Sequence, residues 1–290
     1  KSEDIDIAVD IMSGEKFANL VGQWMQEHGM PTHVTILDPD PDASKPVETA
    51  MVPILGTSID FVQLRTDEYE ADSRKAKVTP TTDPAEDAKR RDLTINSIFY
   101  NINTGEVEDF VGGIEDLKND VIRTPRNPYD TYMEDPLRIL RAIRFAAKYN
   151  MNLDTDLIEA AKRPEVQAAF RRTIAPERIW KELAGGKTPE GEWKRGFMAG
   201  PNFDRAAEMM KTLGLRDMIL VPTEEQLQRA RKPHRDIEGG KWEQGFGDWD
   251  MPQENPHHNL NVWEHTMAAL KHLRQIHDAN VSKDVKRNAE

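Results

Sequence analysis

The feature that most constrains the fold of this chain is a change of character at residues 133–145, which read M-E-D-P-L-R-I-L-R-A-I-R-F. Residues 1–137 contain 13 Lys and Arg against 28 Asp and Glu, whereas residues 138–195 contain 13 against 8. The acidic part shows the alternating apolar pattern of strands, and the basic part shows the spacing of amphipathic helices. We therefore expect an acidic, strand-containing head followed by helices.

A helix is expected to begin at Pro136, because proline suits the first turn and Glu134 and Asp135 would complement the positive end of the helix. Asp135 and Arg138 would then share one helical face, with Arg141 rotated away from it. A carboxylate beside a guanidinium offers an acceptor next to donors, which fits the edges of cytosine and adenine better than that of uracil. The alternative reading is a capped helix with an exposed ion pair of little energetic value.

The composition limits the class of protein. A chain of 290 residues is long enough for two domains, and a third is possible. There is no cysteine, which excludes disulfides and thiolate metal sites and suits a reducing compartment, so we predict a cytoplasmic location with the mitochondrion as the alternative. No apolar run is long enough to cross a bilayer, and no membrane partner is expected. The net charge of −12 combines an acidic head with a basic segment, as in a metal-dependent enzyme acting on RNA, although ordinary surface variation would look similar.

A strand is predicted over residues 4–10, which read D-I-D-I-A-V-D. Side chains two residues apart project from the same face, so Asp4 and Asp6 would lie together and Ile5 and Ile7 would lie on the other side. Two close carboxylates repel each other unless a cation lies between them, and Mg²⁺ favours carboxylates together with phosphate oxygens. The pair is a candidate metal site; the alternative is a strand end that simply faces solvent.

The remaining elements follow from periodicity and from turn residues. We expect an amphipathic helix over residues 12–25 and strands over residues 32–37, 49–55 and 58–65, with Asp60 as a possible third carboxylate on a neighbouring strand. Residues 66–83 are charged and have few apolar anchors, which predicts a mobile loop. Further expectations are a hairpin through residues 103–106, helices over 153–161 and 203–213, shorter helices set off by Pro164 and Pro176, a turn at 185–191 and loops over 232–256.

Two further runs carry polar side chains suited to a nucleotide. Residues 87–100 set basic, acidic and amide side chains beside an apolar run, with enough donors and acceptors for a triphosphate and a ribose. Basic residues at the start of an ordinary helix would give a similar pattern. In the run D-F-V-G-G-I-E-D-L at 109–117, the paired glycines permit backbone angles that other residues resist, which predicts a bend or hinge.

In their order and spacing, these motifs resemble those of the class II tRNA nucleotidyltransferases, the CCA-adding enzymes, and of their bacterial poly(A) polymerase relatives. The resemblance extends through E-R-I-W-K-E-L at 177–183 and covers residues 1 to about 186. It implies an α+β fold, with a polymerase-beta-like nucleotidyltransferase head of mixed sheet and helices followed by an all-α neck and body. The implied domains are a head at 1–130 that lacks its N-terminal part, a neck with the template helix at 131–195, and a body at 196–290 that ends in the start of an HD-like domain.

The resemblance also implies roles for individual residues. Asp4 and Asp6 would be the catalytic residues and would hold two Mg²⁺ ions for in-line attack on the α-phosphate. The implied nucleotide-binding residues are Arg90, Arg91, Asp92, Asn96, Asp135, Arg138 and Arg141. The implied hinge residues are Asp109, Gly112, Gly113 and Asp116, and the implied supporting residues are Glu134, Arg178 and Glu182.

The implied reaction adds C, C and A to the 3′ end of tRNA, with CTP and ATP as substrates. Bacterial poly(A) polymerases typically carry a strongly basic segment shortly before the strand that contains Asp60, whereas residues 46–56 here contain no basic residue. The long segment 66–83 is also retained, although relatives that add only CC tend to lack it. CCA addition is therefore favoured, with poly(A) synthesis as the alternative.

A third reading is a non-catalytic RNA-binding fragment, because this sequence lacks the glycine-rich segment that relatives carry upstream of D-x-D. Near the end of the chain, His265 resembles the first metal-binding histidine of an HD-type phosphohydrolase domain. The only His-Asp dipeptide, His277-Asp278, follows closely after it. We therefore expect a truncated domain without a metal at His265.

Overall fold

The computed structural model describes residues 5–30, 32–37, 49–69, 76–185, 196–197 and 202–220. The chain divides into two compact units. We call Lys1–Asn119 with Arg123–Asp135 the head unit, and Asp120–Ile122 with Pro136–Glu290 the helical unit. This division does not test the domain boundaries predicted at residues 130 and 195, which remain a prediction.

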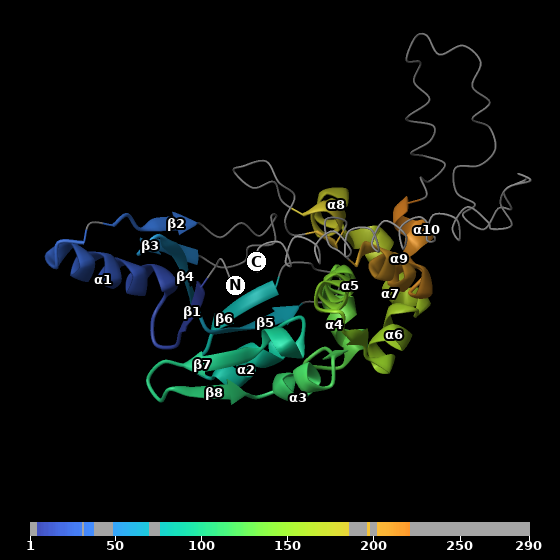
Figure 1. Ribbon diagram of the computed structural model, residues 1–290, viewed down its shortest axis with the longest axis horizontal. Coiled ribbons are helices and arrows are strands. Elements are labelled where there is room, and N and C mark those ends of the chain that lie inside the picture. The colour runs from blue at the N-terminus through green and yellow to red at the C-terminus, as the bar shows by residue number, and fades with distance from the viewer. Residues whose placement is uncertain are drawn as a thin grey trace, which may run out of the picture. The chain divides into compact units, whose positions relative to one another are not determined.

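The head unit contains a mixed four-stranded sheet, as predicted from the alternating apolar residues. β1 runs parallel to β4, whereas β4 and β3 and then β3 and β2 are antiparallel. One helix, α1, lies along this sheet (Figure 1) and buries the apolar side chains that alternate along the strands. The bounds are β1 (Ile5–Val9), α1 (Gly14–Glu27), β2 (Thr35–Leu37), β3 (Thr49–Ile54) and β4 (Thr57–Gln63).

The start of α1 shows how closely this helix packs on the sheet. The Ser13 side chain caps the helix by accepting a hydrogen bond from the Lys16 amide at 3.2 Å. A Cβ atom at Gly14 would lie 2.2 Å from the Phe61 carbonyl oxygen, so the close approach requires glycine. The buried core between α1 and the sheet consists of Val9, Ala18, Met25, Ala50, Val52 and Phe61.

The prediction of a loop over residues 66–83 is wrong for its described part. β5 (Arg65–Tyr69) and β6 (Ala76–Pro80) form an antiparallel pair, while residues 70–75 lie outside the described residues. The segment has few apolar anchors, but pairing satisfies its backbone donors and acceptors, and Arg65 and Asp67, whose charged side chains are mostly buried, contact α2 (Pro84–Arg90). A prediction based on the number of apolar side chains therefore missed these two strands, which backbone pairing stabilises.

The rest of the head unit alternates short helices and one hairpin. The β7–β8 pair confirms the hairpin predicted through residues 103–106. The bounds are α2 (Pro84–Arg90), the 3₁₀ helix η1 (Thr94–Asn96), β7 (Ile98–Asn101), β8 (Glu106–Asp109), α3 (Gly113–Lys118) and α4 (Pro128–Glu134).

The expected helix is present as α5, but it begins at Arg138, two residues after Pro136, and Asp135 lies outside it. Glu134 is the last residue of α4, and Asp135 has an extended backbone with φ −145° and ψ 96°. Residues before a proline are forced away from helical angles, so Pro136 ends α4 at this point. The next helix, α5, begins at Arg138, and Asp135 therefore does not share a helical face with Arg138.

In its described part, the helical unit contains α5 (Arg138–Tyr149) and five further helices. Pro164 and Pro176 stand in the first turns of α7 and α8, as predicted. A two-residue parallel pair, β9 (Val121–Ile122) with β10 (Asn152–Leu153), is the only strand pairing among the described residues of this unit. The other helices are α6 (Thr155–Ala161), α7 (Pro164–Thr173), α8 (Pro176–Ala184), α9 (Phe203–Thr212) and α10 (Leu215–Leu220).

The predictions for residues 186–191 and 232–256 and for His265 and His277-Asp278 lie outside the described residues. Within the described ranges, no helix combines the length and the apolar character that a membrane span requires.

Candidate active site

The first part of the candidate site is a pair of carboxylates on the head sheet. Asp6 of β1 lies directly opposite Asp60 of β4 in the parallel pairing. Paired residues of neighbouring strands project from the same face of a sheet, and these strands lie about 4.8 Å apart. The adjacent residues Ile7, Ile59 and Phe61 project from the opposite face and belong to, or pack against, the core beneath α1. The two carboxylates therefore share the face that α1 does not cover.

This pair has the donor chemistry of a divalent metal site. Hard cations such as Mg²⁺ prefer carboxylate oxygens, and two neighbouring carboxylates on one face repel each other without a cation. Asp4 lies outside the described residues, and among the residues that are described no group of three His, Asp or Glu side chains could hold a metal ion. Asp6 and Asp60 are thus the described part of this candidate site.

The second part is organised by Asp87, a carboxylate in α2 with 1% of its side chain exposed. Its Oδ1 accepts hydrogen bonds from Nε of Arg90 at 2.8 Å and from the backbone N–H of Arg65 at 3.2 Å. Its Oδ2 accepts a hydrogen bond from Nε of Arg91 at 2.9 Å. Asp87 precedes the two arginines by three and four residues, which places all three side chains on one face of the helix end.

Arg90 also ties α2 to β5. Its Nε donates to the Arg65 carbonyl at 3.1 Å, and its Nη1 lies 3.4 Å from Asp67 Oδ2. Burial lowers the pKa of Arg65, and the neighbouring Arg90 cation lowers it further, against the opposing effects of Asp67 and Asp87. Much of the hydrogen-bonding capacity of Arg90 is therefore used inside the protein.

Arg91, Asp92 and Asn96 form the next part of this segment. Arg91 Nη1 donates to the Asn96 carbonyl at 2.9 Å, and its guanidinium lies over the Phe99 ring, 4.6 Å from the centroid. Asp92 accepts hydrogen bonds from the Leu93 amide and from the Asn96 side chain. The structure brings Arg90, Arg91, Asp92 and Asn96 together in one segment of the head unit, and their nucleotide contacts stay a prediction.

The predicted hinge begins with a carboxylate that caps α3. Asp109 accepts four backbone hydrogen bonds, from the amides of residues 111 to 114, at 2.8 to 3.2 Å. Burial raises the pKa of the Asp109 carboxyl, but the four N–H donors outweigh this effect and lower the pKa below its usual value. Asp109 therefore fixes the turn that contains the two glycines.

The two glycines serve different purposes. Gly112 has φ +82°, in the left-handed region, whereas a Cβ atom at Gly113 would lie 2.3 Å from the Thr94 carbonyl oxygen. Asp116, which is buried, accepts hydrogen bonds from the Thr94 hydroxyl at 2.7 Å and from Arg123 Nη1 at 2.9 Å. These contacts hold α3 against η1, and motion at this motif stays a prediction from the resemblance.

Glu134 and Asp135 end α4 in the head unit. Both carboxylate oxygens of Glu134 accept from the guanidinium of Arg126, and Arg126 Nε donates to the Lys89 carbonyl. Glu134 was predicted as a supporting residue, and its bidentate partner Arg126 was not foreseen. The boundary between the two units falls directly after Asp135.

The basic residues of the template motif lie in the helical unit. Arg138 is buried in the first turn of α5. Arg144 Nε donates to Glu182 Oε2 at 2.7 Å, and Arg141 Nη1 lies 3.8 Å from Glu182 Oε1. Glu182 of α8 thus contacts α5, which suits a supporting role. Arg178 lies in the same helix α8.

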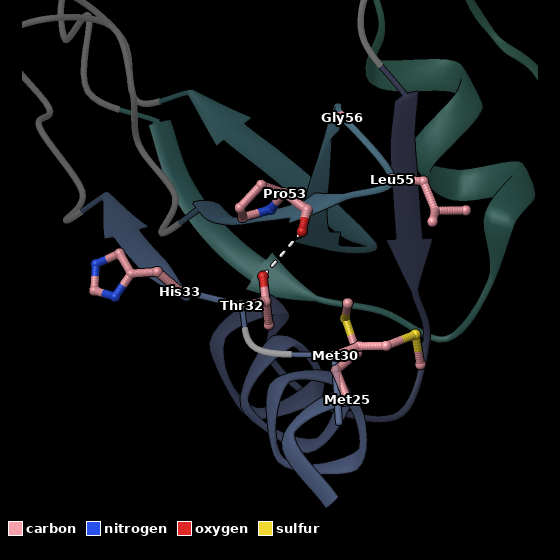
Figure 2. A pocket seen from close by; sticks show the side chains of 7 residues that line it. All are labelled: Met25, Met30, Thr32, His33, Pro53, Leu55 and Gly56. Carbon is pink, nitrogen blue, oxygen red and sulfur yellow. Dashed lines mark hydrogen bonds between the residues drawn. The ribbon is translucent and has the colours of Figure 1, made fainter. Parts of the chain in front are cut away.

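A separate hollow of about 550 Å³ lies at the end of α1 and the β3–β4 turn. Figure 2 shows the side chains that line it, with the Thr32 hydroxyl donating to the Pro53 carbonyl at 2.9 Å. None of the predicted site residues lines this hollow, which is formed by Met25, Met30, Thr32, His33, Pro53, Leu55 and Gly56.

The structure thus adds two residues that the sequence-based reasoning did not assign. Asp87 had a local signal, since its spacing to Arg90 and Arg91 is that of neighbours on one helical face. Arg126 had none, because it lies eight residues before Glu134 and far from Lys89 in the sequence. Only the fold brings its partners together.

The chain is similar in sequence to a known family model and to curated proteins. Residues 1–123 match the family model described as "Poly A polymerase head domain". The chain is 43% identical over 188 residues to "CCA tRNA nucleotidyltransferase, mitochondrial" of Saccharomyces cerevisiae, covering 63% of this chain and 34% of that protein. It is 43% identical over 229 residues to the protein of the same name from Candida glabrata, covering 76% of this chain and 40% of that protein. The chain thus spans less than half the length of these curated relatives.

Comparison with solved structures supports the fold. A CCA-adding enzyme in complex with ATP superimposes with a TM-score of 0.56 at 24% identity, over 77% of this chain and 45% of that one. This likeness confirms the predicted α+β class, with a mixed sheet followed by helices. Nucleotidyltransferases of this kind generally use a divalent metal. Residues 1–123 therefore match the poly(A) polymerase head-domain family, and the predicted resemblance of the chain to tRNA nucleotidyltransferases and bacterial poly(A) polymerases is confirmed.

Proposed function

We propose that the protein containing this chain is a nucleotidyltransferase that adds C, C and A to the 3′ end of tRNA, with CTP and ATP as substrates. The observation that carries the proposal is the 43% identity over 229 residues to a protein named CCA tRNA nucleotidyltransferase. The Asp6–Asp60 pair on the uncovered sheet face and the arginine segment of the same head unit supply side chains of the type that this chemistry requires.

The proposed metal is Mg²⁺, held by Asp6 and Asp60 together with Asp4. A divalent ion bound there would neutralise the triphosphate and lower the pKa of the attacking 3′-hydroxyl. The carboxylates keep the site acidic, and the arginines of the 90–91 segment offer charge-assisted donors for phosphate oxygens. Of this pair, Arg91 is the more exposed, with 30% of its side chain accessible against 17% for Arg90, and we propose it as the principal phosphate contact.

Base choice by Asp135 and Arg138 belongs to this proposal as the role that the resemblance gives them. The observed backbone changes how Asp135 is held: it follows α4 as an extended residue rather than lying on a helix with Arg138. Asp135 is the C-cap of α4, and its backbone N–H donates to the Thr131 carbonyl at 3.3 Å.

The proposal is tested with the complete protein, tRNA that lacks its terminal CCA, Mg²⁺ and one labelled nucleotide at a time. We expect incorporation of CTP, then of ATP after two cytidines, and at most weak incorporation of UTP. Incorporation of UTP as readily as CTP would contradict the proposed selection of the base.

The metal site is tested by Asp6→Asn, with Asp10→Asn as the matched control. Asp10 lies just after the same strand and is exposed, and its side chain accepts a hydrogen bond from the Ile11 amide. We expect Asp6→Asn to weaken Mn²⁺ binding, measured by electron paramagnetic resonance, by at least about tenfold, because a carboxylate ligand is lost. Equal Mn²⁺ affinity in the two variants would place the metal elsewhere.

Poly(A) synthesis is a second candidate, favoured by the name of the matching head-domain family. It would produce long A tails on RNAs unrelated to tRNA. The absence of basic residues over 46–56 favours CCA addition. The third reading, an RNA-binding protein without activity, predicts tRNA binding with no incorporation of any nucleotide by the complete protein.

Two observations bear on the cellular compartment of the protein. The absence of cysteine suits a reducing compartment, which gave the prediction of a cytoplasmic protein. The yeast relatives carry "mitochondrial" in their names, and this favours the mitochondrion as a second location. Fractionation of cells that produce the tagged complete protein distinguishes the two.

A further inference from the structure

One guanidinium in the head unit joins two segments that are distant in the sequence. Arg126 Nε donates to the Lys89 carbonyl at 3.0 Å, and Nη1 donates to Glu134 Oε1 at 2.9 Å. Its Nη2 donates to the second carboxylate oxygen, Glu134 Oε2, so the pairing is bidentate. The three contacts use both edges of the planar group.

Each partner of Arg126 directly precedes a predicted nucleotide-binding residue. Lys89 precedes the Arg90-Arg91 pair, and Glu134 precedes Asp135. Arg126 therefore holds the end of α2 and the end of α4 on one rigid group. The spacing between the arginine segment and Asp135 depends on this group within the head unit.

Helix electrostatics explain why a cation is needed at this point. The last carbonyls of a helix lack intrahelical donors and carry partial negative charge, and the Lys89 carbonyl is one of these in α2. Glu134 is an anion in the last turn of α4, which contains no basic residue, so its charge is unfavourable there. Arg126 offsets both effects at once. A lysine could not do so with the same geometry, because its ammonium group lacks the fork that spans a carboxylate.

We propose that Arg126 is a positioning residue for nucleotide binding, which sets Asp135 relative to the Arg90-Arg91 segment so that both reach the same nucleotide. This inference rests on the proposed function. Arg126 acts through Lys89 and Glu134 and is not assigned a contact with the nucleotide.

The test measures steady-state kinetics and nucleotide binding on the complete protein. The variants are Arg126→Lys, Arg126→Met, Glu134→Gln and the double variant Arg126→Met with Glu134→Gln. We expect each Arg126 variant to raise KM for CTP, and the Kd for CTP in equilibrium dialysis, by about tenfold, the effect of one lost charge-assisted hydrogen bond. The double variant should be no worse than the poorer single variant, because both changes break the same contact.

Lys118→Met is the matched control. Lys118 forms an ion pair with Glu115 in the same unit at 4.0 Å, and about 70% of each side chain is exposed. This variant should leave KM and Kd for CTP unchanged. Urea unfolding of every variant distinguishes a role in stability from a role in nucleotide binding. A purely structural residue would lower the unfolding midpoint without changing KM of the folded protein.

The outcomes are distinct. A tenfold rise in KM and Kd, with no additivity in the double variant, supports the positioning role. Unchanged KM and Kd in folded Arg126→Met overturns it and leaves the proposed function intact. If the wild-type protein neither binds nor incorporates CTP, the proposed function itself fails and this role fails with it.

Discussion

The buried carboxylate of Asp87 gives the sharpest prediction about the head unit. It has 1% side-chain exposure, and it accepts hydrogen bonds from the side chains of Arg90 and Arg91 and from the backbone of Arg65. Asp87→Asn keeps the shape of the side chain but removes the charge. It also turns an amide NH₂ group toward donors, so at least one arginine loses its acceptor.

The expected loss of unfolding free energy follows from the burial of the Asp87 side chain. Removing one partner of a buried ion pair typically costs about 3–5 kcal/mol, because the other charge is left without compensation. The two arginines keep 17% and 30% side-chain exposure, so water recovers part of the loss. We therefore expect the free energy of unfolding to fall by about 3 kcal/mol, at the low end of that range.

The measurement is urea unfolding of the complete protein, followed by circular dichroism, for the wild type and two variants. Glu86→Gln is the matched control, since Glu86 is adjacent in α2 and its ion pair with Lys89 is exposed, at 46% and 49% of the side chains. Exposed pairs contribute about 0–1 kcal/mol, so this variant should unfold close to the wild type. If Asp87→Asn were no less stable than Glu86→Gln, the account of Asp87 as the organiser of the arginine pair would be wrong.

Two further predictions concern the glycine-containing turn. Gly113→Ala should lower the free energy of unfolding by about 2 kcal/mol, because its Cβ would lie 2.3 Å from the Thr94 carbonyl oxygen; thermal unfolding checks this, and an unchanged midpoint would show that the turn can shift. The pKa of Asp109 lies below its usual value of 3.8 in the folded protein, so its stabilising effect is complete above about pH 4–5 and is lost as the pH falls through the folded pKa. Asp109→Asn should therefore flatten the loss of stability with acid, and an equally steep loss in wild type and variant would assign it to other carboxylates.

Local patterns in the sequence were sufficient for much of the head. The alternation in residues 5–9 and 57–63 predicted strands, and it correctly placed Asp6 on the face opposite Ile5 and Ile7. That Asp60 would pair with Asp6 in register could be suspected only from the order of the motifs. Register depends on the whole sheet, and a shift of one residue would turn Asp60 to the other face.

The errors came from competing local signals. Pro136 does precede a helix, which begins at Arg138, but it also ends the preceding helix α4, which Asn127 and Pro128 start; Asp135 is therefore extended and does not lie on the helix of Arg138. The β5–β6 pair was not predicted, because the prediction of strands relied on apolar side chains and this segment has few of them. Contacts such as Arg126 with Lys89 and Glu134 have no local pattern, since residues 37 and 8 positions apart meet only in the folded head.

The most direct test of the central claim is to sequence the RNA 3′ ends produced by the complete protein. The protein is incubated with Mg²⁺, all four nucleoside triphosphates and tRNA that lacks its terminus. The account predicts that most extended molecules end in C-C-A with no further addition. Long runs of A, or U at the first two added positions, would contradict it.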